Sequence, residues 1–418
     1  MMFLKRHALL LIIVGFGILV SLLSTSIKTS YQVFFVAMSD DFALSRGEFA
    51  WSGTLFMAVF GISSPIVGYI ADRIGAKQTI IGGLLLSGLL FLLMALTESF
   101  TAFLLLYGIG AAFAYTAISY VSLGVLVEEI NAPKIRGLIY ALVTNGAALG
   151  FVFLAPLWLY LEAFFSWRDI YLVTGLVFVL PITLLAILVL RFSRVDRAPE
   201  LRLTASKAPD YLSARLRQVF GNANFYYLSL GFLGCGVTMA FVDIHLVAQL
   251  KDRAYSAHFI ALSLVVLGVA EFVGGIAAGL LCDRYPARLV LSGFYLLRAV
   301  AVFILFAFPS QLGVLLFAGV FGLSFMGTVV GTSVVSLTIF SKQIRGFAFG
   351  FVWLFHQVGA LLATQLGAHL YDLRGNYQLV LLVTGLIALV SALLVLKIRL
   401  AVRPPDQDIR AVTIQSAR

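Results

Sequence analysis

The sequence is poor in charged residues, which make up only 11% of its 418 positions. A soluble globular domain carries roughly 25% Asp, Glu, Lys and Arg. Hydrophobic residues account for 61% of the chain. No soluble fold can bury that much apolar surface, so the composition predicts a polytopic protein whose solvent is a lipid bilayer.

Cysteine is also scarce, and the usual catalytic signatures are missing. Cys235 and Cys282 lie in apolar surroundings without CxxC or metal-ligand spacing, so we interpret both as small core residues. The chain has no GxSxG, no HExxH and no GxxxxGK[ST] motif. We therefore expect no enzyme activity, no metal and no cofactor, and any energy for work must come from ion or solute gradients.

Twelve apolar runs are long enough to cross a bilayer as helices. We expect spans at residues 8–38, 48–70, 77–96, 101–127, 136–160, 168–191, 223–248, 256–281, 287–308, 311–339, 345–369 and 377–398. The first run is preceded by Lys5 and Arg6, as in a signal peptide, but no small-residue cleavage site follows it. We interpret it as an uncleaved first helix.

The net charge of +10 raises the question of a nucleic-acid partner, but its distribution argues against one. If both termini are cytoplasmic, most Lys and Arg residues fall in inner segments, as the positive-inside rule requires. The outer loops then keep only Arg46, Arg168, Lys251, Arg253 and Arg374. This pattern predicts a multi-pass protein of a cell membrane, taken to be a bacterial inner membrane.

One long polar segment divides the chain into two sets of six spans. We expect an N-terminal bundle at 1–190, a basic cytoplasmic linker at 191–222, a C-terminal bundle at 223–400 and a cytoplasmic tail at 401–418. The basic linker also favours anionic lipid headgroups. We expect the protein to be a monomer.

The two sets of spans resemble each other at an offset of about 210 residues. "GYIADRIGAK" at 68–77 recurs as "GLLCDRYPAR" at 279–288, "IRG" at 135–137 recurs at 344–346, and "LVTGL" at 172–176 recurs at 382–386. Each match alone is weak, but together they keep nearly one offset along the chain. Parallel repeats of six spans are typical of two-bundle transporters.

The repeated loops predict a cytoplasmic gate. Asp and Arg are adjacent in both copies, and the candidate gate residues are Asp72, Arg73, Lys77, Asp283, Arg284 and Arg288. We expect an ion-pair lock between helix ends that breaks when the bundles rock; the alternative is a loop that only sets topology. Ser45 and Ser256 are expected to cap the second helix of each half, and Ser45 with Glu48 fits a capping box.

With these loops the sequence resembles the major facilitator superfamily along its whole length. Segments 42–77, 154–157, 165–175, 245–256 and 371–385 are similar to the monocarboxylate-transporter branch and its bacterial relatives. The resemblance implies an all-α fold of twelve transmembrane helices in two pseudo-twofold bundles, and transport of small organic acids coupled to protons. The fourth and fifth spans lack the arginine and the GPxxGG stretch that are usual in drug–proton antiporters.

The sequence departs from that branch at its charged positions. Glu271 stands where the branch has an acid, but Gly275 stands one turn later where the branch has an arginine. Lys28 matches the lysine of the first span only approximately, one residue out of register. The anion-binding charges of the branch therefore do not transfer directly.

Charged residues inside spans are expected to face partners, a cavity or a ligand. Placing one at the bilayer centre costs at least ~2.5–3.5 kcal/mol. Glu271 and Arg298 lie on consecutive antiparallel helices, ~15 and ~16 Å from the cytoplasmic end. We expect Glu271 to neutralise Arg298 in a structural pair, in preference to direct anion binding by Arg298. A third reading is a pair that releases charge when Glu271 binds a proton, since burial favours the protonated carboxyl.

The remaining polar residues of the spans define a candidate substrate site. Lys28 is a candidate anion contact, or else reaches the outer interface. His356 is either a titratable group or a packing residue, and His245 is expected at the outer surface. The candidate substrate-binding residues are Lys28, Tyr115, Tyr120, Asn145, Arg298, His356 and Gln357, and the candidate proton-coupling residues are Glu271 and Asp243.

These features together predict a secondary transporter that works by alternating access. The favoured substrate is a small, monocarboxylate-like organic anion moved with a proton. One alternative is an exporter of a larger amphipathic or siderophore-like metabolite, which the 13% of aromatic residues could suit. Another is a solute sensor that binds without transport. The expected partners are a small molecule, protons and the bilayer, with no nucleic acid.

Overall fold

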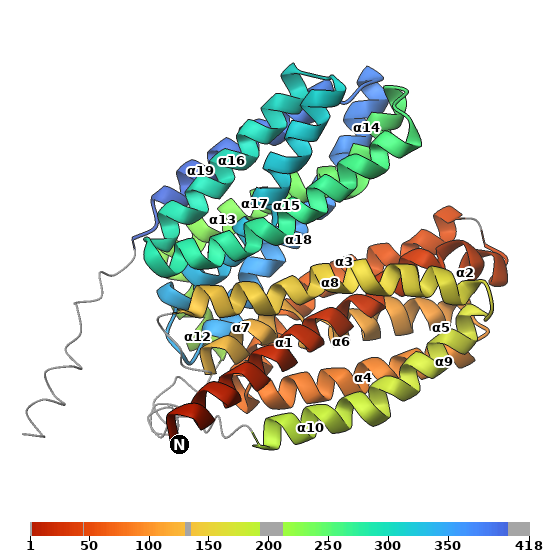
Figure 1. Cartoon of the computed structure of the whole chain (residues 1–418), viewed down its shortest axis with the longest axis vertical. Helices are drawn as coiled ribbons and strands as arrows, with labels where there is room; N and C mark the ends of the chain where they lie inside the picture. Colours follow the sequence, from red (N-terminus) through yellow and green to blue (C-terminus); the bar gives the residue numbers. More distant parts are fainter. Residues whose placement is uncertain (1, 45, 130–134, 193–211, 400–418) are drawn as a thin grey trace, which may run out of the picture.

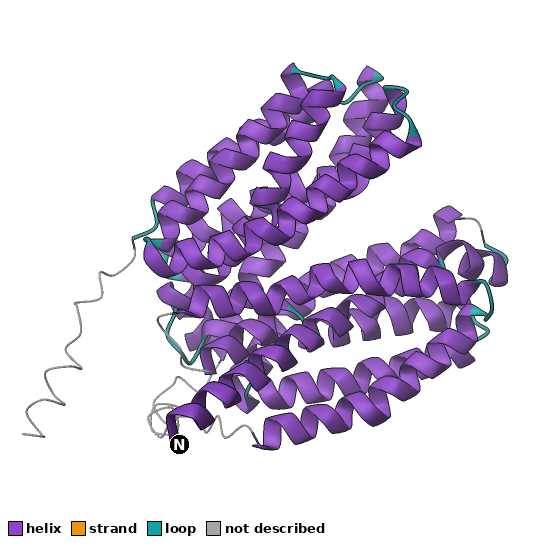
Figure 2. Ribbon diagram, viewed as in Figure 1, coloured by secondary structure: helices purple, strands orange, loops and turns teal. Residues whose placement is uncertain are grey.

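A computed structural model of the chain describes residues 2–44, 46–129, 135–192 and 212–399. Within these ranges the chain is built of helices joined by short loops, without strands (Figure 2). Twelve helices in the described part are long and apolar enough to cross a membrane, and they fall at the twelve predicted positions.

The first six spans form the first bundle. Its helices are α1 (Met2–Val33), α2 (Phe35–Asp41), α3 (Arg46–Ile74), α4 (Ala76–Leu96), α5 (Phe100–Leu105), η1 (Leu106–Ala111), α6 (Ala112–Ala117), α7 (Tyr120–Glu129), α8 (Arg136–Glu162), α9 (Trp167–Val177), η3 (Phe178–Ile182) and α10 (Thr183–Phe192). Here η denotes a π-helical turn inside a longer span.

The last six spans form the second bundle. Its helices are α13 (Ala223–Ala240), η4 (Phe241–His245), α14 (Leu246–Asp252), α15 (Ala257–Arg284), α16 (Ala287–Ala307), α17 (Gln311–Ile339), α18 (Arg345–Arg374) and α19 (Gln378–Leu396). Before it comes α12 (Leu212–Phe220), a short helix inside the segment predicted to be a linker. The rest of that segment between 193 and 211, and the tail at 401–418, lie outside the described residues.

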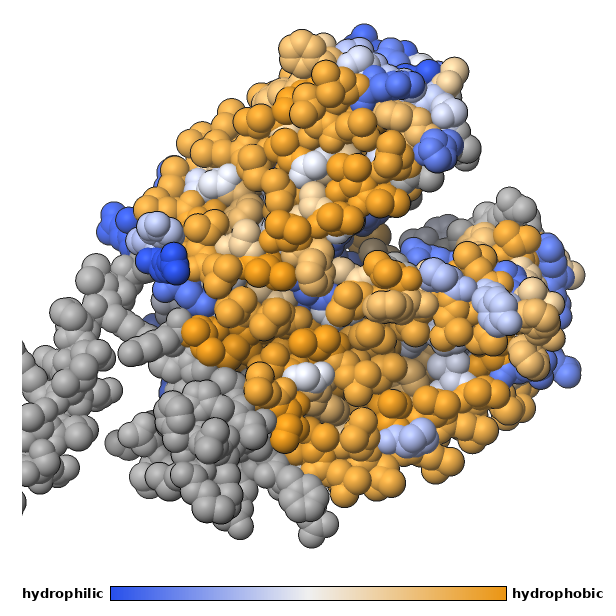
Figure 3. Space-filling view, in the orientation of Figure 1, coloured by the Kyte–Doolittle hydropathy of each residue, from blue (hydrophilic) through white to orange (hydrophobic). Residues whose placement is uncertain are grey.

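The bundles touch at one end and diverge at the other. In Figure 1 they meet near α7 and α12, and they separate towards α2, α5 and α14. We call these the closed end and the open end. The space-filling view shows a wedge-shaped cleft between the bundles at the open end, and a broad apolar surface on both (Figure 3).

Paired glycines bring the backbones of the two bundles together near the closed end. A Cβ on Gly137 of α8 would lie 2.6 Å from the carbonyl oxygen of Gly279 on α15. The second contact is equivalent: a Cβ on Gly346 of α18 would lie 2.6 Å from the carbonyl oxygen of Gly68 on α3. All four glycines belong to the repeated "GxxxDR" and "IRG" motifs, so each copy of one motif packs on the other motif across the bundle interface.

The predicted serine cap at the start of α15 is confirmed. The Ser256 hydroxyl accepts a hydrogen bond of 3.3 Å from the backbone N–H of Phe259. Its counterpart Ser45 lies outside the described residues.

Candidate functional site

Arg298 is fully buried on α16, and its guanidinium is surrounded by hydrogen-bond acceptors. Nε donates to Ser324 Oγ, Nη1 donates to Cys235 Sγ and Thr238 Oγ1, and Nη2 donates to Ser324 O, Phe325 O and Thr328 Oγ1, at 2.7–3.3 Å. These acceptors belong to α13 and α17. Arg298 therefore joins three helices of the second bundle from inside and turns no donor towards the cleft.

The predicted contact between Arg298 and Glu271 is wrong. Both side chains lie in the described part of the chain, yet no ion pair joins them, and their interaction is only long-range. Equal depth brought them to the same level but did not fix how each helix is rotated. α15 packs mainly on α17, and α16 lies against α17 and α19, so consecutive helices are not the closest neighbours here.

Lys28 of α1 lies among three aromatic rings of the first bundle. Its Nζ is 4.6 Å from the ring centroid of Tyr115, 5.3 Å from that of Phe60 and 5.9 Å from that of Phe56. A cation over ring faces gains electrostatic attraction, but no carboxylate of the described chain pairs with it. Lys28 is half-buried.

Three aromatic residues, which we call the aromatic floor, join the two bundles near Lys28. They are Phe60 of α3, Tyr120 of α7 and Trp353 of α18. Trp353 stacks on Tyr120 with ring centroids 4.6 Å apart and lies 6.0 Å from Phe60. The sequence analysis did not select Trp353, although it lies three residues before His356; in the described structure its indole N–H is buried without a partner.

Two carboxylates of the second bundle face this region. Asp243 lies in the π-helical turn η4, and such turns often occur at functional sites. Its side chain is exposed, yet it interacts electrostatically with Lys28 of the other bundle and with His356. Glu271 of α15 interacts in the same way with Asp243, and Tyr120 interacts with both acids. Asp243 is thus an exposed acid of the second bundle that interacts with a cation of the first.

The histidines are bonded or packed within the second bundle. His356 Nδ1 lies 2.9 Å from Gln357 Oε1, and its Nε2 lies 3.4 Å from the sulfur of Met239. Both ring nitrogens therefore have partners, as in a packing residue. His245 was expected at the outer surface, but it is 5% exposed and packs on Tyr377 and Gly367. That expectation is wrong because η4, which carries His245, packs against α18.

Asn145 of α8 carries an acceptor without a donor. Its Nδ2 donates to the carbonyl oxygen of Phe272 on α15 at 3.2 Å, which fixes the orientation of the amide, while its Oδ1 is buried and unpartnered. A Cβ on Gly275 would lie 2.7 Å from that Oδ1. The asparagine therefore occupies the space into which a larger side chain at position 275 would extend.

The closed end is held by two equivalent carboxylate contacts. Asp72 of α3 accepts hydrogen bonds from the backbone N–H groups of Gly346 and Phe347, at 2.8 and 2.9 Å. Asp283 of α15 accepts from Gly137 and Leu138, at 2.7 and 2.9 Å. Each acid therefore binds the N-terminus of a helix in the opposite bundle, where free N–H groups and the helix dipole favour an anion.

The two acids of the predicted gate thus contact the opposite bundle, but they do so without the predicted ion pairs. The acids bind helix N-termini instead of the arginines beside them. Arg73 lies over the ring of Tyr69 at 5.3 Å, Arg288 donates to the carbonyl oxygen of Ile398 at 2.9 Å, and Arg284 is exposed. Lys77 is half-buried at the start of α4.

The ion pairs at the closed end involve residues that the sequence analysis did not select. Glu128 of α7 pairs with Arg136 of its own bundle at 2.7 Å and with Arg345 of the other bundle. Arg215 of α12 lies 3.8 Å from Asp72 and donates to the carbonyl oxygen of Gln343. The signal for two of them was present, because Arg136 and Arg345 are the arginines of the repeated "IRG".

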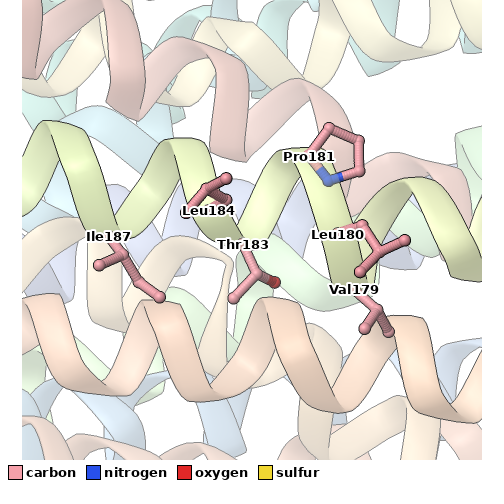
Figure 4. Close-up of a pocket in the computed structure, with 6 residues that line it drawn as sticks. All are labelled: Val179, Leu180, Pro181, Thr183, Leu184 and Ile187. Carbon is pink, nitrogen blue, oxygen red and sulfur yellow. The ribbon is translucent and has the colours of Figure 1, made fainter.

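A shallow depression on the outer surface lies apart from these groups. Figure 4 shows its lining on η3 and α10: Val179, Leu180, Pro181, Thr183, Leu184 and Ile187. Its lining is almost entirely apolar, and Leu180 and Leu184 are more than half exposed on the face expected to meet lipid. It contains no group that could select a charged solute.

Two six-helix bundles with a cleft between them define a membrane protein of transporter architecture. A family model described as "Major Facilitator Superfamily" matches residues 14–250 and 238–413, so the chain belongs to this superfamily. Members of this family are transporters and not enzymes. The chain is therefore a multi-pass membrane protein that acts on a small molecule within the bilayer.

Relatives and solved structures agree with this assignment. The chain is 26% identical over 368 residues to an uncharacterized MFS-type transporter, YcxA, of Bacillus subtilis, covering 86% of this chain and 87% of the relative. It is 27% identical over 371 residues to monocarboxylate transporter 13 of Rattus norvegicus, covering 87% and 83%. The proton:xylose symporter XylE superposes with a TM-score of 0.72 at 14% identity, covering 94% and 96%, which shows the shared fold.

Proposed function

We propose that the protein is a secondary transporter that moves a small organic acid together with a proton by alternating access. The observation that carries the proposal is the placement of three charges without ion-pair partners. Lys28 of the first bundle interacts electrostatically with Asp243 of the second, and Asp243 interacts with Glu271 of its own bundle. Charged groups inside a membrane protein are costly, so their retention without partners is typical of substrate and ion pathways.

Each charge has a distinct part in this proposal. Lys28 binds the carboxylate of the substrate, and Tyr115 holds its side chain in place. Asp243 and Glu271 bind the proton, because two neighbouring carboxyl groups resist carrying two negative charges. Arg298 stabilises the second bundle and does not contact the substrate, since its donors are used inside the bundle.

The closed end is assigned to the cytoplasmic side. This orientation places both termini inside the cell and makes the described conformation outward-open. Movement to the inward-open state breaks the hydrogen bonds of Asp72 and Asp283 to the opposite bundle. Binding of substrate and proton in the cleft supplies the free energy that offsets their loss.

Similarity supports the same proposal. The relatives include proteins named monocarboxylate transporters, and the structural neighbours include proton symporters for xylose and fucose. Glu271 stands at the position of the acid in the monocarboxylate branch.

The test is uptake of labelled lactate and pyruvate into proteoliposomes with and without an inward proton gradient. Gradient-stimulated, saturable uptake is expected, with a KM raised at least tenfold by Lys28→Gln, the loss of one charge-assisted contact of about 1.5–3 kcal/mol. Lys28→Arg, which keeps the charge, is the matched variant. Absence of uptake from folded protein contradicts the proposal and directs attention to larger amphipathic solutes, export or sensing.

A further inference from the structure

We infer that the preferred solute at this site is amphoteric: a small molecule with a carboxylate at one end and a basic nitrogen at the other. The carboxylate pairs with Lys28 of the first bundle. The nitrogen binds between Asp243 and Glu271 of the second, which together carry one negative charge when they hold the transported proton. This inference rests on the transport function proposed above and specifies its substrate class. It follows from the balance of charges and acceptors around the cleft.

The balance of charge in the cleft is acidic. Of the buried cations near the site, Arg298 is enclosed by acceptors from α13 and α17 and is unavailable to a ligand. Position 275, where the monocarboxylate branch has an arginine, is a glycine here and supplies no cation. The amide of Asn145 fills the space beside it. In the described part of the chain this leaves one cation, Lys28, with two carboxylates. A solute that is only an anion has no group to pair with those two acids.

One neutral group near Glu271, the side-chain oxygen of Asn145, lacks a hydrogen-bond donor among the described residues. Asn145 Oδ1 is an acceptor on a side chain that is 2% exposed, and it has no partner in the described structure. The amide cannot be flipped to give Oδ1 a partner, because Nδ2 donates a hydrogen bond to Phe272 O in the present orientation. A buried unpartnered acceptor costs about 1–3 kcal/mol. Asn145 Oδ1 lies against the turn of α15 that runs from Glu271 to Gly275. An N–H group bound at Glu271 is therefore beside the same helical turn as this acceptor.

The site thus contains two kinds of group, one that binds an anion and one that binds a hydrogen-bond donor or a cation. Lys28 supplies positive charge, and the indole N–H of Trp353 in the aromatic floor is an unpartnered donor. Asp243, Glu271 and Asn145 Oδ1 supply acceptors. A solute with a carboxylate alone satisfies the first set and leaves the second unmatched, whereas an amphoteric solute satisfies both. Because Lys28 belongs to the first bundle and Asp243 and Glu271 belong to the second, such a solute also bridges the bundles.

Matched solutes test this directly in proteoliposomes of the full-length protein. The probes are labelled 4-aminobutanoate and butanoate, which share a carbon chain and differ in the amino group, with unlabelled butylamine as competitor. We expect a KM for 4-aminobutanoate at least about tenfold below that for butanoate, the effect of one ion pair of about 1.4 kcal/mol. Asp243→Asn and Glu271→Gln should each reduce this preference, and Lys28→Gln should weaken uptake of both solutes.

The control is Asp252→Asn, an exposed acid at the end of α14 that takes no part in the site, and it should keep the wild-type preference. Preference for butanoate over 4-aminobutanoate overturns the inference and leaves proton-coupled acid transport standing. Equal competition by butylamine and 4-aminobutanoate, unaffected by Lys28→Gln, also overturns it, since the site then selects cations. Absence of uptake of either acid, lactate and pyruvate included, contradicts both the inference and the proposed function.

Discussion

A carboxylate oxygen of Asp283 lies 2.7 Å from the backbone nitrogen of Gly137 and accepts its hydrogen bond across the bundle interface. Asp72 makes the equivalent contact with Gly346 at 2.8 Å. The two contacts are related by the internal repeat, and each places an acid at the N-terminus of a helix in the other bundle. Both must break for the closed end to open.

Neutralising Asp283 should therefore shift the protein towards the conformation in which the closed end has opened. Hydrogen bonds to a charged group contribute about 1.5–3 kcal/mol, so Asp283→Asn should raise the population of the opened closed end by roughly tenfold or more. Spin labels at Gln78 and Tyr285, exposed beside the two acids, would report this as a longer distance in pulsed EPR. The labels require a background in which both native cysteines are replaced by serine.

Asp252→Asn is the matched control for this experiment, because it removes an acid at the opposite end of the second bundle. It should leave the label distances unchanged. A wild-type distance distribution in the Asp283→Asn variant would show that the contact does not hold the end closed.

Glu128 should be coupled unequally to its two arginines in the closed state. Its pair with Arg345 joins the bundles, whereas its pair with Arg136 lies within one bundle. A double-mutant cycle on the same label distances, using Glu128→Gln with Arg345→Gln, should give a coupling of about 0.5–3 kcal/mol. The cycle with Arg136→Gln should change protein melting more than it changes the distances. Equal effects of the two cycles on the distances would refute this division.

Removal of Arg298 should destabilise the protein independently of Glu271. Arg298→Leu leaves the acceptors of α13 and α17 without donors, so we expect a fall in Tm of at least about 5 °C in detergent. Since the two residues do not touch, the double variant with Glu271→Leu should show the sum of the single effects, within about 0.5 kcal/mol. A double variant more stable than Arg298→Leu alone would instead indicate that the residues do pair.

The pH dependence of uptake should depend on Glu271. If this carboxyl carries the transported proton, Glu271→Gln fixes the site in a neutral form that resembles the protonated state. Net uptake driven by a proton gradient should then lose most of its pH dependence, while exchange of solute across the membrane is partly retained. We would compare pH profiles of uptake and exchange in the same liposomes. An unchanged uptake profile in the variant would remove Glu271 from the proton pathway.

Much of the fold was predictable from the sequence because a bilayer restricts the possible structures. Apolar runs of fixed length must be helices, and the expected run at 287–308 is observed as Ala287–Ala307. The offset between the "GxxxDR" motifs predicted two related bundles and selected the two acids that join them. Helix ends were predictable where a local signal exists, as at Ser256.

Side-chain partners inside the bundles were less predictable. Depth along a helix follows from residue count, and it placed Glu271 and Arg298 at one level. Rotation about the helix axis and the choice of neighbouring helix depend on packing among all twelve spans. For the same reason the sequence indicated that Asp72 and Asp283 matter but did not identify the backbone amides that they bind.

The sequence by itself determined that this chain spans a membrane twelve times, that its halves are repeats, and which few charges lie inside. These properties follow from local composition and spacing, on which the insertion of a helix into the bilayer depends. Only the tertiary structure decided which of these charges has close partners. Arg298 is satisfied by hydroxyl, thiol and carbonyl groups from two other helices, whereas Lys28, Asp243 and Glu271 have no ion pair in the described part of the chain, because only the packed bundle determines which groups come within reach.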